Sequence, residues 1–125
     1  MIRILTLAAL AGATLSAPAL AEGDPAAGEK VFNKCKACHM VGDNAQNRVG
    51  PQLNGIVGRP VSAVEDFKYS DASHEAAAGG MVWTEENLAA YLADPRKFMP
   101  GNKMSFAGLR KAQEVADVIA YLKQY

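Results

Sequence analysis

Cys35, Cys38 and His39 stand together in the segment CKACH and form the most chemically specific pattern in the chain. Two thiols three residues apart, followed at once by an imidazole, are the signature of covalent c-type haem attachment. On a helical turn each thiol can add to one vinyl group of a single porphyrin, and the histidine can then bind the iron. Because the motif occurs once, the sequence predicts one covalent haem c, attached at Cys35 and Cys38, with His39 as an iron ligand.

Other uses of the two cysteines fit the sequence less well. A redox-active C-x-x-C disulfide would be expected within a βαβ pattern, and no such pattern surrounds residues 35–39. A zinc site needs four ligands, and outside the motif the chain offers only His74 and carboxylates. Two buried structural cysteines would not need a histidine beside them.

The second axial ligand of the iron stays open on the residue types alone. His74 lies in a polar, alanine-rich stretch, so we expect it to be a solvated surface residue. A methionine thioether suits the iron of an electron carrier. Met99 and Met104 lie five residues apart in a loop with proline and glycine between two predicted helices. Because methionines are also common in cores, these grounds do not separate the two.

Three amphipathic helices are predicted to position these groups. The first begins at Asp24-Pro25, where aspartate can cap and proline fits the first turn, and it runs for about ten residues. The second begins at Thr84 and is stopped by Asp94-Pro95. The third is the clearest, because apolar residues recur at i, i+3, i+4 and i+7 from Val115 to Leu122.

The middle of the domain has no pattern typical of a strand or a helix. Six Gly or Pro residues fall within residues 42–60, and no element is predicted from about residue 41 to residue 69. A loop of that length is unusual unless it wraps around something other than polypeptide. A short alanine-rich helix after Ser70, ended by glycines 79–80, is also expected. The prediction is an all-α domain with long loops wrapped around one haem.

The chain divides into a leader and one domain. Residues 1–21 carry one charge, Arg3, followed by an apolar run over residues 4–15 and the small-x-small sequence of residues 19–21. This pattern predicts a cleaved secretory signal peptide, whereas glycine and proline within the uncharged run of residues 4–21 weaken the alternative of a permanent membrane anchor. We therefore expect residues 22–125 to form a domain exported to a bacterial periplasm.

Composition excludes several functional classes. The 125 residues include 13 Lys and Arg against 13 Asp and Glu, and 50% are hydrophobic. Without a basic excess the chain is not expected to bind nucleic acid, and with this apolar content it is not a disordered chain. Two cysteines three residues apart cannot form a disulfide framework.

Residues 23–125 resemble class I cytochrome c, the family of small soluble monohaem carriers that includes the mitochondrial protein and the bacterial c-two type. The matching segments are Gly28 and Phe32, CKACH, GPQLNG at 50–55, Gly58-Arg59, FKYSDA at 67–72, Trp83–Leu92, PGNKMSFAG at 100–108 and IAYLK at 119–123. The resemblance implies the class I cytochrome c fold, with three main helices, short helices and long loops around one haem. It also implies a monomer.

The resemblance further implies how the iron is held. It selects Met104 over Met99 as the ligand opposite His39. Pro51 would offer its carbonyl to the outer imidazole nitrogen and fix the ring's orientation. Tyr91 would lie close to the sulfur of Met104.

A second group of residues is implied at the haem propionates. Tyr69 and Trp83 would donate hydrogen bonds to a buried propionate, and Arg59 would offset its charge. The chain departs from the family in two places. Asn102 stands where threonine is common, and the stretch from Tyr69 to Trp83 is a few residues longer than in the mitochondrial carriers.

The functional expectation follows from the ligands. An iron bound by histidine and methionine has no open position, and the thioether raises the reduction potential. The resemblance thus implies a one-electron carrier and not an enzyme, moving electrons between membrane-bound respiratory or photosynthetic complexes. The donor would be a quinol-oxidising bc-type complex, and the acceptor a terminal oxidase, a photosynthetic reaction centre or a reductase. The alternative is a five-coordinate haem enzyme or gas sensor with a labile sixth ligand.

Charge is distributed unevenly along the domain. Residues 30–48 and 96–111, which flank the expected ligands, hold nine positive residues and one negative residue, whereas the rest of the domain holds three and twelve. We call the nine the positive rim: Lys30, Lys34, Lys36, Arg48, Arg96, Lys97, Lys103, Arg110 and Lys111. Such a rim would steer an acidic membrane-bound partner to the haem edge.

Overall fold

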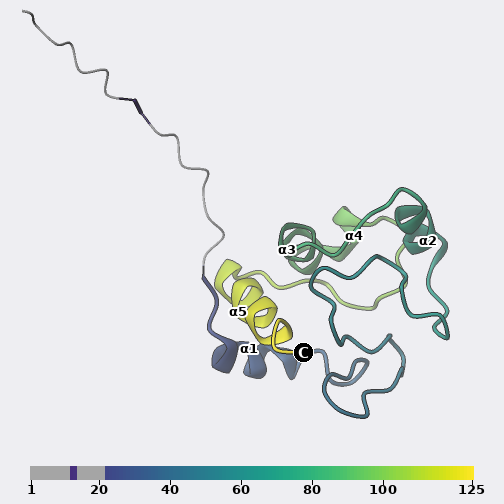
Figure 1. Cartoon of the computed structure of the whole chain (residues 1–125), viewed down its shortest axis with the longest axis horizontal. Coiled ribbons are helices and arrows are strands. Elements are labelled where there is room, and N and C mark those ends of the chain that lie inside the picture. Colours follow the sequence, from purple (N-terminus) through teal and green to yellow (C-terminus); the bar gives the residue numbers. More distant parts are fainter. Residues whose placement is uncertain (1–11, 14–21) are drawn as a thin grey trace, which may run out of the picture.

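The computed structural model describes residues 12–13 and 22–125, so the predicted signal peptide lies almost wholly outside the described residues. Helices are the only regular elements in the described part (Figure 1): α1 (Pro25–Phe32), α2 (Asp71–Ala78), α3 (Glu85–Ala93), α4 (Pro95–Phe98) and α5 (Ala112–Leu122). One isolated antiparallel bridge joins Pro60 to Val82. No described helix is long and apolar enough to span a membrane. The predicted all-α class is confirmed.

Local sequence explains where the helices begin. Asp24, Ser70 and Thr84 cap α1, α2 and α3 through side-chain oxygens that accept backbone N–H groups. Capping was predicted for Asp24, and the helix starts at the other two positions were predicted without it. The four-residue helix α4 was not predicted. Asp94 caps it and Pro95 occupies its first turn. The Asp-Pro pair that stops α3 is therefore also the start signal of α4.

Helices α1 and α5 cross at close range (Figure 1), and the CKACH segment directly follows α1. A Cβ atom at Gly28 would lie 1.9 Å from the backbone oxygen of Asp117 and 2.8 Å from the Cβ of Tyr121. The rings of Phe32 and Tyr121 pack with their centroids 5.3 Å apart. The crossing places the end of α1 just before the cysteines.

Gly28→Ala should lower the free energy of unfolding of the holoprotein by about 1–3 kcal/mol, because the new methyl group must push α5 away. Denaturant titration measures this change. Gly79→Ala is the matched control, since a Cβ there meets only atoms at 3.4 Å or more and its φ of −78° suits alanine. Equal stabilities for the two variants would show that the helices do not cross as described.

Residues 41–69 form neither helix nor strand, as predicted, yet they are tied to the helical part. Gly58 donates its N–H to the carbonyl of Trp83 at 2.7 Å, and Gly55 donates to the carbonyl of Tyr125 at 3.3 Å. Ile56 and Val61 bury their side chains in the core. The loop is therefore held against the segments that carry Trp83 and the C-terminus.

Candidate haem-binding site

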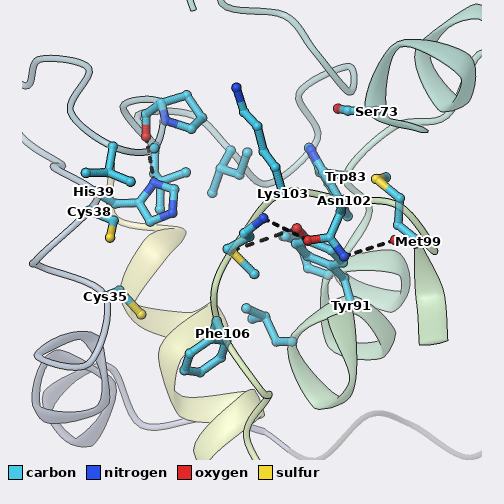
Figure 2. Close-up of a pocket in the computed structure, with 18 of the residues that line it drawn as sticks. Cys35, Cys38, His39, Ser73, Trp83, Tyr91, Met99, Asn102, Lys103 and Phe106 are labelled. Carbon is cyan, nitrogen blue, oxygen red and sulfur yellow. Dashed lines mark hydrogen bonds between the residues drawn. The ribbon is translucent and has the colours of Figure 1, made fainter. Parts of the chain in front are cut away.

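A cavity of about 250 Å³ lies between the long loop, the helices and the segment that follows α4. Every residue predicted for the site contributes to its wall: Cys35, Cys38, His39, Pro51, Arg59, Tyr69, Trp83, Tyr91 and Met104. Figure 2 shows Cys35, Cys38 and His39 at one side of the cavity, and Trp83 and Tyr91 at the other. Segments distant in the sequence thus bring two chemically distinct groups face to face.

The first group is built on the turns that continue the chain after α1. The N–H groups of Cys38 and His39 both donate to the carbonyl of Cys35, at 3.1 and 2.9 Å. This turn places both thiols and the imidazole at one wall of the cavity. The Nδ1 of His39 donates to the carbonyl of Pro51 at 2.7 Å, which leaves Nε2 as the nitrogen that can bind a metal (Figure 2). Burial lowers the pKa of His39, so the ring is held neutral, the form that ligates.

Gly50 supports the same ring in a way that the sequence did not reveal. A Cβ atom at this position would lie 2.3 Å from Cε1 of His39. The N–H of Gly50 donates to the carbonyl of Cys38 at 3.0 Å. In the sequence this glycine is identified only as part of the segment GPQLNG. Its place next to the imidazole depends on contacts across the loop, for which the sequence carries no local signal.

The second group surrounds Met104. The hydroxyl of Tyr91 donates to Sδ of Met104 at 3.8 Å, and burial raises the pKa of Tyr91 to about 12, so the phenol keeps its proton. Met99 also lines the cavity and is 7% exposed. The hydrogen bond from the phenol therefore distinguishes Met104 from Met99, which residue types alone could not do.

A cationic corner adjoins these groups. Arg59 donates through its terminal nitrogens to the carbonyls of Gln52 and Asn54, but its Nε is buried without a hydrogen-bond partner in the described part of the chain. Burial also lowers the pKa of Arg59, which means that its charge is poorly solvated. The hydroxyl of Tyr69 accepts the backbone N–H of Val64 at 3.1 Å. This corner fits an acidic group.

The longer stretch between Tyr69 and Trp83 contains α2 and places two further polar residues, Ser70 and Ser73, at the cavity. Ser73 is 8% exposed, and its hydroxyl lies 2.8 Å from that of Ser62. His74 is exposed and does not line the cavity, as predicted, and its ring lies edge-on to Tyr69 with centroids 5.9 Å apart. Ser73 was missed, because nothing in its neighbouring residues indicates burial.

The residues present fit a covalently attached haem. Two thiols and an oriented neutral imidazole face a thioether across a cavity with mainly apolar walls, and a poorly solvated guanidinium lies where an acidic substituent would be stabilised. These are the protein groups that a haem c requires. An acidic substituent of the haem would supply the acceptor that the buried Nε of Arg59 lacks in the described part of the chain.

Comparisons with known proteins agree with this geometry. A family model described as cytochrome c matches residues 25–125. Cytochrome c-550 of Ancylobacter novellus is 54% identical over 101 residues, which cover 81% of this chain and 94% of that protein. Cytochrome c2 of Agrobacterium tumefaciens is 50% identical over 101 residues, covering 81% and 91%.

A solved structure supports the same assignment. Cytochrome c2 from Rhodospirillum centenum superposes with a TM-score of 0.77 at 46% identity, and the match covers 82% of this chain and 98% of that one. Sequence, fold and cavity chemistry agree over the same residues. The chain therefore belongs to the cytochrome c family, as a class I cytochrome c with the electron-carrying function and the single covalently bound haem of that family.

Proposed function

We propose that this chain is a periplasmic one-electron carrier whose haem is attached through Cys35 and Cys38 and bound axially by His39 and Met104. The observation that carries the proposal is the pair of hydrogen bonds that orients the two axial side chains. One runs from His39 to a backbone carbonyl at 2.7 Å, and the other runs from Tyr91 to the Met104 sulfur at 3.8 Å. The bound haem supplies the one-electron redox chemistry.

The chain's own residues hold that group and limit what it can do. If His39 and Met104 both held the iron, no position would remain for a substrate, and the chain would be an electron carrier and not an enzyme. Arg59, Tyr69 and Trp83 supply a cation and two donors for a buried propionate, which offsets the cost of burying its charge. The neutral phenol of Tyr91 restrains the thioether without adding a charge.

The proposed location and partners rest on the sequence pattern and on the relatives. Residues 1–21 have the form of a cleaved export signal. Relatives named cytochrome c2 come from bacteria such as Blastochloris viridis, whose protein is 49% identical over 109 residues. A periplasmic carrier would accept electrons from a membrane-bound quinol-oxidising complex and deliver them to an oxidase, a reaction centre or a reductase.

Two residues of the positive rim border the cavity. Lys34 and Lys103 line the cavity and are exposed. Val49 also lines the cavity and is 77% exposed. Arg48 stands exposed beside Val49. An exposed apolar side chain with cations near it is a suitable docking surface for an acidic partner.

Not every lysine of the positive rim has the same role. Lys34 forms an ion pair with Glu114 at 3.2 Å. The ammonium of Lys103 donates to the carbonyl of Lys68 and lies 4.9 Å from the centroid of the Phe67 ring. Other exposed lysines, Lys36 and Lys97 among them, have no ion pair within the described residues. They report on docking more cleanly than Lys34 or Lys103.

The proposal predicts salt-dependent electron transfer from membranes containing a quinol-oxidising bc-type complex to the ferric holoprotein. Between about 10 and 150 mM salt the Debye length falls from about 30 Å to about 8 Å, so the second-order rate constant should fall roughly tenfold or more. Stopped-flow absorbance of haem reduction measures it. At low salt, Lys36→Gln and Lys97→Gln should each slow the reaction.

Lys123→Gln is the matched control, since it also removes one positive charge but lies outside the rim, paired with Glu85. It should leave the rate near that of the parent protein. A rate independent of salt would exclude docking on the rim. Failure of the membranes to reduce or reoxidise the protein at any salt concentration would exclude the carrier function in this pathway.

A further inference from the structure

We propose that Asn102 is a positioning residue that fixes the backbone of Met104, and through it the sulfur that binds the iron. The inference rests on the proposed axial role of Met104. Asn102 stands at the position where threonine is common in the family. The carboxamide of Asn102 bridges three backbone groups, and Figure 2 shows its bond to Met99.

The three hydrogen bonds use both N–H groups and the oxygen of the carboxamide. Its Oδ1 accepts the N–H of Met104 at 2.9 Å. Its Nδ2 donates to the carbonyl of Pro95 at 3.0 Å and to that of Met99 at 2.9 Å. Only this orientation of the amide pairs donors with acceptors at all three contacts, since both carbonyls need a donor and the N–H needs an acceptor.

The bridge matters because Met104 lies in a segment without regular secondary structure. Residues 99–111 contain no helix or strand. The N–H of Met104 has the Asn102 side chain as its partner, and the carbonyl of Met104 accepts from Phe106 at 3.0 Å. Through Pro95, the bridge ties this segment to the first residue of α4, which is buried. Asn102 therefore anchors the ligand's backbone to a helix, while Tyr91 restrains its sulfur.

Other side chains could reproduce only part of this arrangement. Aspartate at position 102 keeps an acceptor for the N–H of Met104 but has no donor for the carbonyls of Pro95 and Met99. Leucine has a similar size and forms none of the three bonds. The two substitutions therefore divide the bridge into its parts, and the loss of restraint on Met104 should be larger for leucine than for aspartate.

Imidazole added to the ferric holoprotein tests the inference, because it competes with the methionine sulfur for the iron. Asn102→Leu should bind imidazole at least about tenfold more tightly than the parent protein, the change expected when about 1.4 kcal/mol of restraint is lost. Asn102→Asp should show a smaller increase. Optical titration gives the affinities, and denaturant titration gives the stability of each variant.

Asn87→Leu is the matched control, because the Asn87 amide also donates to a backbone carbonyl, that of Val82 at 2.8 Å, but at the start of α3. It should lower stability without changing the affinity for imidazole. If Asn102→Leu binds imidazole no more tightly than Asn87→Leu, the positioning role is refuted. Should Asn102→Leu fail to accumulate, an unchanged affinity in Asn102→Asp refutes it equally.

Met104→Ala separates this inference from the function on which it rests. If Met104 binds the iron, this variant should bind imidazole far more tightly than the parent protein. A parent-like affinity in Met104→Ala would contradict the axial ligand itself. Tight binding in Met104→Ala together with a parent-like affinity in Asn102→Leu would contradict only the role of Asn102.

Discussion

Met104→Ala should abolish the sulfur-to-iron absorption band of the ferric holoprotein and lower its reduction potential by on the order of 100 mV or more, within the roughly 0.8 V over which axial ligands move haem potentials. The reason is the loss of the thioether, which favours the reduced iron. The Tyr91 hydroxyl, 3.8 Å from the Met104 sulfur, would lose its acceptor in the same variant. Absorption spectroscopy and a redox titration measure the two effects.

Met99→Ala is the control for this prediction, because Met99 lines the same cavity and is 7% exposed. Removing its buried side chain should cost about 2–5 kcal/mol of stability while leaving the band in place and the potential nearly unchanged. The two variants thus separate packing from ligation. Loss of the band in Met99→Ala, with its retention in Met104→Ala, would reverse the ligand assignment.

The double variant Cys35→Ala/Cys38→Ala should accumulate poorly and be largely unfolded. It removes both covalent links, and without haem the loop of residues 41–69 would face an apolar cavity instead of a packed core. Water in that cavity would expose apolar surface, which lowers the free energy of unfolding by roughly 25 cal/mol per Å² of exposed apolar area. Far-UV circular dichroism and the yield of exported protein measure the loss.

Each single cysteine variant keeps one attachment point and should give an intermediate yield of haem-containing protein. These variants show whether the loss follows attachment or only the substitution of a half-buried side chain. A cooperative thermal unfolding transition in the haem-free double variant would contradict the prediction, because it would show that residues 22–125 fold without haem.

The sequence predicted most of what is local. Helix starts at Asp24, Ser70 and Thr84 depend on a capping side chain and its next few neighbours, so they are visible in the chain itself. Helix α4 was overlooked because Asp94-Pro95 was interpreted only as the end of α3. The same capping signal, applied a second time, identifies it.

The site divides along similar lines. Cys35, Cys38 and His39 form a contiguous motif, whose chemistry depends on spacing alone. The choice of Met104 required a resemblance to a family, since its hydrogen bond from Tyr91 joins different segments. Gly50 and Asn102 act through contacts that form only when the loops are folded. Their residue types permit many roles, so no local pattern could have assigned these.

The crossing of α1 and α5 joins two helices that are synthesised at opposite ends of the domain. The N–H of Asp24 donates to the side chain of Asp117 at 2.8 Å, across 93 residues of sequence. Chain synthesis proceeds from the N-terminus, so CKACH is made long before α5 exists to pack against α1. The cysteines are therefore presented on an unpacked chain for most of its synthesis. Haem attachment has an accessible substrate then, and closure of the last helix completes the domain.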